Sequence, residues 1–274
     1  MTFTAEKKLL SCSKLPPVSI YSCFLSKFPS ENINNRTNDA NLQWTGSTKS
    51  SFEAEFGTVK PAKFAFLQLE NVDTIGEIIW NGAKIGNVRN SFRKYLFDVS
   101  KSINPTNQLQ IDLQAPVIAA KQAAEAQFPI KQYPECPVSA QTNGQCHVNM
   151  LRKPQYSFSW DWGPSMPDSG IYDSPKLLVF DSSAIFDAKL QLLSAFSDDL
   201  QTLQVQVLIL HPNSESAPAG QAIVNFKPAL RFSEDAMKFE KVDENLWKGT
   251  MNLQIEREEI NWWWIHGMGK QEQS

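Results

Sequence analysis

Along most of the chain, apolar and polar side chains alternate with a period of two, which is typical of β-strands that bury one face. The clearest alternation runs through residues 108–113. Leu109, Ile111 and Leu113 would share one face of this strand, and the polar residues between them would share the other. The pattern predicts antiparallel strands as the main elements, with helix as the exception.

Three further stretches of the first half carry local signals. Residues 63–69 are an apolar run of strand length. In residues 77–86 the pair Asn81-Gly82 stands between two apolar runs, which is the strongest short signal for a β-hairpin. Residues 115–129 are rich in alanine and bounded by prolines, so they predict a short helix or turn that crosses one end of the sheets.

The second half repeats the strand pattern after a junction at residues 181–183, Asp-Ser-Ser. Strand-like runs then recur at intervals typical of a β-sandwich, with turn residues between them, at 188–196, 202–210, 222–226 and 246–255. The stretch from 184 to 274 has about ninety residues, close to the size of an immunoglobulin-like sandwich. The sequence therefore predicts two β domains in series.

Composition excludes some partners. The chain has 274 residues, 42% hydrophobic and 20% charged, which is enough for sizeable cores. Its net charge of -3 offers no basic surface to a phosphate backbone, so we expect no nucleic acid partner. No apolar run approaches the roughly 18 residues needed to cross a bilayer, so we expect no membrane span.

The N-terminal region shows no clear signal peptide. Residues 15–28 are moderately apolar, but two prolines and Lys27 interrupt them, and Lys14 directly precedes them. Asn35 begins an Asn-Arg-Thr triplet, which is a possible N-glycosylation site. Because such triplets also arise by chance, an unmodified surface loop at Asn35 is an equally good interpretation.

The four cysteines, Cys12, Cys23, Cys136 and Cys146, could pair in three ways. The loop between Cys136 and Cys146 is polar and short enough for its ends to meet. A zinc site would need Cys-x-x-Cys spacing with nearby histidines, and the three histidines are scattered. A disulfide is thus favoured over a metal site, and we expect no metal; free thiols remain the alternative.

A short aromatic stretch, FSWDWGP at residues 158–164, places Asp161 between Trp160 and Trp162 and ends in a Gly-Pro pair. On the residues alone, a structural interpretation comes first. Aromatic side chains before Gly-Pro at a sandwich corner are usually part of the core, and an aspartate there usually caps backbone N–H groups.

Residues 146–172, CHVNMLRKPQYSFSWDWGPSMPDSGIY, resemble the signature segment of the β-mannosidases of glycoside hydrolase family 2, which carry a closely similar Arg-Lys-x-x-x-Ser-Phe-x-Trp-Asp-Trp-Gly-Pro. Residues 70–99 resemble the sheet and hairpin that precede this segment in the family. Residues 262–271, WWWIHGMGKQ, resemble the stretch that ends the family's second domain, although Ile265 stands where the family usually has proline. The resemblance is weak in residues 1–43.

The resemblance implies an all-β fold: a jelly-roll, galactose-binding-like β-sandwich at 44–183, followed by an immunoglobulin-like β-sandwich at 184–274. It leaves residues 1–43 as a poorly matched N-terminal segment. In animal members of the family, the cysteines that match Cys136 and Cys146 form a disulfide.

The resemblance also implies a binding role for the aromatic stretch, because in the family this loop lines a mannose pocket whose active site lies mainly on a TIM barrel. Asp161 would accept hydrogen bonds from two adjacent sugar hydroxyls. One of Trp160 and Trp162 would stack on the sugar, and the other would lock the loop. In a regular strand both indoles point away from Asp161, so the chain must bend, most naturally at Gly163-Pro164.

Two other groups are expected to be structural. Arg152 and Lys153 precede the loop and are expected to be solvated side chains that support it. Trp262, Trp263 and Trp264 are expected to be apolar anchors at a domain boundary or against the barrel.

Family members hydrolyse terminal non-reducing β-D-mannose residues of β-mannosides in glycan and glycoprotein catabolism, without a cofactor, and are lysosomal or secreted. Their two catalytic glutamates lie on the barrel, one of them directly after an asparagine. This sequence contains no Asn-Glu pair, and the roughly 250 residues of a barrel do not follow before Ser274. No residue of this chain is therefore assigned to catalysis.

We thus expect the N-terminal, pocket-completing and scaffold part of a β-mannosidase, inactive alone. Its partners would be a terminal β-mannoside and a family TIM-barrel domain that is not present in this chain. The alternative is a stand-alone, non-catalytic carbohydrate-binding or interaction module that has lost the barrel.

Overall fold

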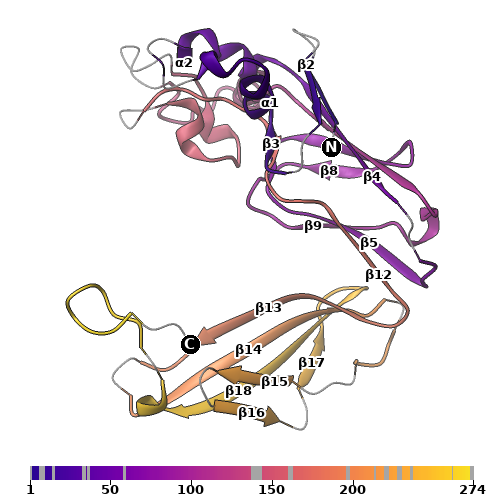
Figure 1. The fold of residues 1–274 in the computed structure, drawn as a ribbon, viewed down its shortest axis with the longest axis vertical. Coiled ribbons are helices and arrows are strands. Elements are labelled where there is room, and N and C mark those ends of the chain that lie inside the picture. Colours follow the sequence, from indigo (N-terminus) through magenta and orange to yellow (C-terminus); the bar gives the residue numbers. More distant parts are fainter. Residues whose placement is uncertain are drawn as a thin grey trace. The chain divides into compact units, whose positions relative to one another are not determined.

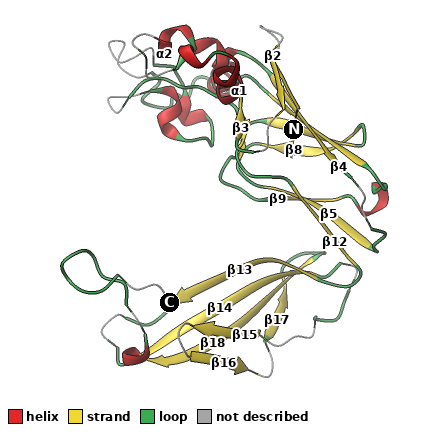
Figure 2. Cartoon of the chain, viewed as in Figure 1, coloured by secondary structure: helices red, strands yellow, loops and turns green. Residues whose placement is uncertain are grey.

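The structure is a computed structural model, and it describes residues 2–5, 10–13, 16–32, 35, 38–57, 60–136, 144–159, 163–195, 198–212, 214–218, 222–226, 230–234, 237–260 and 262–271. The chain forms two compact units, Met1–Val179 and Phe180–Ser274. The boundary lies four residues before the junction expected from the sequence at residue 183. Each unit is built mainly of strands, as Figure 2 shows.

Among its described residues, the first unit contains three sheets. Their strand orders are β2-β1-β4-β10-β7-β8, β12-β5-β9 and β3-β11-β6. The strands are β1 (Thr2–Ala5), β2 (Leu10–Ser13), β3 (Val18–Ser19), β4 (Ser50–Phe56), β5 (Phe64–Leu69), β6 (Val72–Asp73), β7 (Gly76–Trp80), β8 (Ala83–Val88), β9 (Tyr95–Asp98), β10 (Asn107–Leu113), β11 (Gly170–Ile171) and β12 (Lys176–Phe180).

The core of the first unit lies between the sheet that contains β4, β10 and β7 and the sheet that contains β5. Every residue of β5 is buried, as the apolar run at 63–69 predicts. Leu67 of β5 belongs to the same buried cluster as Phe52 of β4, Trp80 of β7 and Ile111 of β10. Because side chains from both layers meet in one cluster, the unit is a β-sandwich.

Two local predictions are confirmed in this unit. Buried and more exposed residues alternate along β10, and Leu109, Ile111 and Leu113 are at most 2% exposed. β7 and β8 form a hairpin whose two turn residues, Asn81 and Gly82, have φ angles of 50° and 81°. A two-residue hairpin turn with positive φ at both positions matches the right-handed twist of the strands, which explains the Asn-Gly pair.

The helix expected within 115–129 is also present, as α3 (Pro116–Glu125). Pro116 occupies its first turn, where the missing N–H costs nothing because no partner would be available for it. Ala119 and Ala120 are buried on the face of α3 that meets Leu151 and Phe158.

A second helix, α1 (Ile20–Lys27), was not expected from the sequence. It begins with a capping box, in which the Ser19 side chain accepts a hydrogen bond from the Ser22 N–H and Ser22 bonds back to the Ser19 N–H. The helix buries Ile20 and Phe24 in the main core of the unit. It lies with the short α2 (Asn38–Asn41) at one end of the sheets (Figure 1).

Residues 1–43, which the sequence analysis set apart, belong to the first unit. β1 pairs with β4 from Thr2↔Glu53 to Ala5↔Ser50 and continues the sheet outward to β2. Strand pairing across almost fifty residues holds this segment in place, and local sequence patterns carry no signal for such pairing.

Both cysteine pairs are disulfide-bonded. Cys136 is joined to Cys146, and Cys12 is joined to Cys23, a pairing that the sequence left open. Cys23 lies in α1 and Cys12 in β2, so the second bridge ties the helix to the edge of the long sheet.

The described residues of the second unit form two antiparallel sheets, with strand orders β13-β14-β18-β17 and β15-β16. Its strands are β13 (Ala184–Leu192), β14 (Leu200–Leu210), β15 (Ala222–Phe226), β16 (Leu230–Glu234), β17 (Lys238–Lys241) and β18 (Leu246–Glu256). Three of the four runs expected from the sequence coincide with β14, β15 and β18. The fourth was expected at 188–196 and begins four residues earlier, as β13, and β16 and β17 were not expected.

Candidate functional site

The predicted site residues Trp160, Asp161 and Trp162 lie outside the described residues. The structure describes the residues that flank them. Ser159 and Gly163 stand on either side. The hydroxyl of Ser159 donates a hydrogen bond to the carbonyl oxygen of Gly163 over 2.8 Å. This bond joins the two described residues that flank the segment 160–162, and the segment with its flanks is called the loop below.

The base of this loop is strained at Ser159. Its φ and ψ angles are 70° and 163°, in a region that is populated almost exclusively by glycine. Such a conformation costs on the order of 1–3 kcal/mol and persists only where the surroundings hold it. Ser159 is 3% exposed, and it directly follows the 3₁₀ helix η5 (Gln155–Phe158). Backbone strain of this kind clusters at ligand clamps, which marks the loop as a candidate site.

Main-chain hydrogen bonds hold both flanks of the loop. On the entry side, the carbonyl oxygen of Phe158 accepts a bond of 2.9 Å from the N–H of Gln145, next to the disulfide-bonded Cys146. Across the base, the N–H of Met166 donates to the carbonyl oxygen of Ser157 over 2.7 Å. These two bonds and the bond from Ser159 to Gly163 therefore hold the strained conformation.

The exit side packs against two other elements. The carbonyl oxygen of Ser165 accepts a bond of 3.0 Å from the side-chain amide of Gln43. Pro167 approaches Gly46 so closely that a Cβ atom at residue 46 would lie 2.6 Å from its ring. Gln43 and Gly46 both belong to the 3₁₀ helix η2 (Gln43–Ser47), so a glycine is required where η2 supports the exit of the loop.

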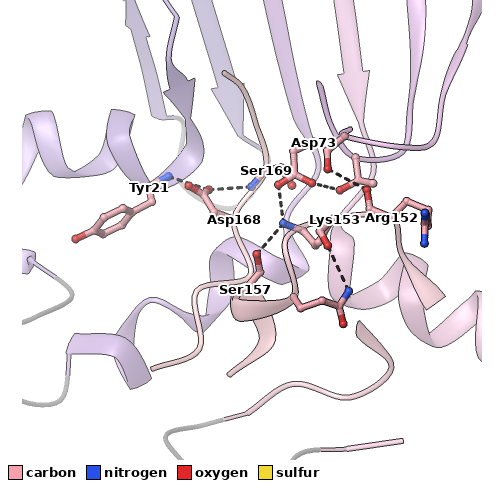
Figure 3. A network of polar contacts seen from close by, with 10 residues as sticks. Tyr21, Asp73, Arg152, Lys153, Ser157, Asp168 and Ser169 are labelled. Carbon is pink, nitrogen blue, oxygen red and sulfur yellow. Dashed lines mark hydrogen bonds and ion pairs between the residues drawn. The ribbon is translucent and has the colours of Figure 1, made fainter. Parts of the chain in front are cut away.

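Beneath the entry side lies a buried ion pair that the sequence analysis did not foresee (Figure 3). The ammonium group of Lys153 is 2.6 Å from Oδ2 of Asp73 in β6 and donates a second bond of 3.3 Å to the hydroxyl of Ser157. Lys153 is 1% exposed and Asp73 is 2% exposed. The expectation that Lys153 is solvated is wrong, because β6 supplies a buried partner; Arg152 is exposed as expected.

A second buried carboxylate, Asp168, holds the exit side. Its Oδ1 accepts hydrogen bonds from the N–H groups of Tyr21 and Ser169, at 3.0 and 2.9 Å (Figure 3). Burial raises the pKa of Asp168 to about 6, although the bonds from Ser19, Tyr21 and Ser169 and the charge of Lys153 all act to lower it.

Sequence reasoning missed both Asp73 and Asp168 as members of the site. Asp168 lies within the segment whose resemblance to the family was recognised, ten residues after Phe158, but its burial could not be inferred from a Pro-Asp-Ser context, which is typical of an exposed turn. Asp73 precedes a threonine in a polar stretch and carries no local signal.

Other predicted residues lie elsewhere. Asn35 is exposed, and its side-chain amide donates a long bond of 3.4 Å to the carbonyl oxygen of Ser30. Trp262 is partly buried, whereas Trp263 and Trp264 are 54% and 36% exposed. Within the second unit these last two indoles are therefore not part of the core.

The described part of the chain shows no cluster of three or more histidine, cysteine, aspartate or glutamate side chains that could hold a metal ion. Among the same residues, no helix is long and apolar enough to cross a membrane. The chemistry of the site as described is thus that of two carboxylates, one ammonium group and hydroxyl groups.

Known proteins resemble this chain over most of its length. It is 28% identical to the β-mannosidase of Rattus norvegicus over 246 residues, which cover 86% of this chain and 27% of the relative. It is 34% identical to the β-mannosidase of Bos taurus over 137 residues, covering 50% and 15% of the two chains. The chain thus spans about a quarter of the length of the rat relative.

Solved structures agree in fold. The crystal structure of the β-D-mannosidase from Dictyoglomus thermophilum matches with a TM-score of 0.71 at 24% identity, covering 93% of this chain and 30% of that one. The exo-chitosanase CsxA of Amycolatopsis orientalis matches with a TM-score of 0.57 at 13% identity, over 98% and 30%. Residues 2–173 match the family model described as glycosyl hydrolase 2 galactose-binding domain-like. Since this match covers more than half of the chain, the protein belongs to that glycoside hydrolase family 2 group.

Proposed function

We propose that this chain is the N-terminal, pocket-completing and scaffold part of a β-mannosidase that removes terminal non-reducing β-D-mannose residues in glycan and glycoprotein catabolism. Support comes from the relatives, which are β-mannosidases several times longer than this chain. The observation that carries the proposal is the geometry of the two residues that flank the loop. Ser159 is strained and is bonded to Gly163, so the chain is held on both sides of residues 160–162.

The residue types of the loop suit a sugar. An ionised Asp161 can accept hydrogen bonds from two neighbouring hydroxyls, and such charge-assisted bonds are about twice as strong as neutral ones. The indole of Trp160 or Trp162 can cover the apolar C–H face of a pyranose ring. Holding these groups in advance would lower the conformational entropy lost on binding.

Catalysis is assigned to a further domain and to no residue of this chain. Two carboxyl groups about 5–5.5 Å apart are needed for hydrolysis with retention. Asp73 and Asp168 are unsuited to that role because both are buried beneath the loop and bonded within the fold. No organic cofactor or metal is part of the proposal.

A chimera tests the role of Asp161. In it, this chain replaces the matching part of the rat β-mannosidase, and hydrolysis of p-nitrophenyl β-mannoside is measured. We expect activity, and we expect Asp161→Asn to lower kcat/KM by about a hundredfold, because charge-assisted bonds of about 1.5–3 kcal/mol each are weakened. Asp173→Asn changes an exposed aspartate in the same way and should leave kcat/KM unchanged.

Two results would count against this role. An active chimera in which Asp161→Asn has the same kcat/KM as the parent would show that the loop does not line the pocket. A folded chimera without hydrolysis would show that this chain does not complete a β-mannosidase site.

The chain by itself is expected to bind methyl β-mannoside more weakly than millimolar, because a pocket with one wall buries too little of the sugar. Isothermal titration calorimetry on the isolated chain measures this. Saturation at millimolar or lower concentration would instead favour a stand-alone carbohydrate-binding module.

We further propose a lysosomal or secreted location for the protein. The two disulfides are stable in oxidising compartments, and the exposed Asn35 is accessible to glycosylation. Loss of glycan mass in an Asn35→Gln variant recovered from a secretory host would support this location, and an unglycosylated parent would remove one of its two supports.

A further inference from the structure

The polar groups beneath the loop fasten both of its ends to the same small sheet. On the entry side, Lys153 bonds to Asp73 in β6. On the exit side, Asp168 immediately precedes β11, where Gly170 pairs with Asp73 on one side and with Ser19 on the other. The entry side of the loop is thus tied to β6 by the ion pair of Lys153 and Asp73. The exit side continues into β11 shortly after the buried carboxylate of Asp168.

The three buried charged groups, one ammonium and two carboxylates, do not balance. Lys153, Asp73 and Asp168 are all at most 5% exposed. The other titratable groups around them are the phenols of Tyr156 and Tyr172, and burial raises the pKa of both above the usual value. Neither phenol ionises near neutral pH, so the cluster is neutral when Asp168 carries a proton and has a charge of -1 when it does not.

We infer that Lys153, Asp73 and Asp168 form a proton-operated latch that holds the backbone on both sides of residues 160–162, and that the latch is tightest when the cluster is neutral. That the latched loop binds a sugar rests on the proposed function above, whereas the latch itself does not. Lys153 and Asp168 act as positioning residues, since Lys153 bonds to the hydroxyl of Ser157 and Asp168 to the backbone N–H of Ser169.

The direction in which pH changes the stability of the closed segment follows from the pKa of Asp168. Burial raises this pKa to about 6, and local opening of the segment would hydrate the carboxylate and return the pKa to its usual value near 4. Protonation therefore favours the closed segment. The protection against opening is complete below about pH 4, falls as the pH rises toward 6, and stays low above that.

Hydrogen exchange of the isolated chain measures this latch directly. The reporters are the amides of Ser157, Ser159, Met166 and Asp168, each bonded to a backbone carbonyl in the segment. Between pH 4 and pH 6.5, after correction for the intrinsic exchange rate, we expect their protection factors to fall by up to about a hundredfold, since one pKa unit is worth a factor of ten. Amides of the buried β5 serve as the internal reference.

Asp168→Asn should remove this pH dependence, because the amide does not titrate, and Asp173→Asn should retain it, because residue 173 is exposed. Protection factors that do not change with pH in the unmodified chain would overturn the latch without any variant. The latch can therefore be refuted even if Asp168→Asn fails to fold. A pH dependence that survives in Asp168→Asn, or that is equally large in β5, would also overturn it.

The exchange experiment needs no sugar, so its outcome and that of the chimera are independent. An active chimera with flat protection would refute the latch and keep the proposed function. A pH-dependent latch in a chain whose chimera is inactive would support the latch and refute the proposed function. In an active chimera, the latch also predicts that KM for the mannoside rises between pH 4 and 6.5 and that Asp168→Asn abolishes the rise.

Discussion

Replacing Lys153 with methionine is expected to lower the free energy of unfolding of the first unit by about 3–5 kcal/mol. Methionine fills similar space but leaves the carboxylate of Asp73, 2% exposed, without its cation in a buried site. The hydroxyl of Ser157 loses the same donor. Equilibrium urea denaturation at pH 7, followed by circular dichroism, measures the loss. Arg152→Met is the matched control, since its side chain is exposed, and it should change the free energy by less than about 0.5 kcal/mol.

A second variant separates the ion pair from the packing. When Asp73→Asn is added to Lys153→Met, no unpaired charge remains at this position, so part of the loss should be recovered. If the double variant were as unstable as Lys153→Met, or if Lys153→Met cost no more than Arg152→Met, the ion pair would not be what holds the entry side of the loop.

Replacing Phe158 with alanine is expected to cost about 3–5 kcal/mol. The ring is fully buried and packs with Ala119 and Ala120 of α3 and with Leu151, so its removal leaves a cavity directly before the strained Ser159. The cost is at the upper end for a single side chain because α3 is fixed by its own contacts and cannot move to fill the cavity. Thermal and urea unfolding of the chain measure it.

Phe128→Ala is the control for size and chemistry. That phenylalanine is 80% exposed, so its removal should shift the free energy of unfolding by no more than about 0.5 kcal/mol. A loss below about 1 kcal/mol for Phe158→Ala would mean that the cluster under the loop collapses without penalty, and the loop base would then not be rigid.

Local patterns were sufficient where neighbours in sequence decide the conformation. The alternation at 108–113 became β10 because one face of this central strand meets the core and the other face is more exposed. The Asn81-Gly82 pair became a hairpin turn because both positions need positive φ. The alanine-rich 115–129 became α3 because proline at the first turn and alanine along the helix are local preferences.

Local patterns failed where a partner came from far along the chain. α1 was not expected, because residues 15–28 are interrupted by prolines and a lysine, yet the Ser19 cap and burial against the core form it. The start of β13 was placed four residues too late, and the short β17 was missed, because partners in β14 and β18 set their limits.

The sequence by itself determined the all-β class and the family, because alternation and a contiguous motif are both readable within short windows. It also supplied the residues of the loop at 160–162, which stay a proposal. Only the tertiary structure decided what lies beneath that loop. Lys153 was expected in water and is instead paired with Asp73, eighty positions away in sequence. Whether a lysine side chain meets solvent or a buried carboxylate depends on which distant strand the fold places beside it.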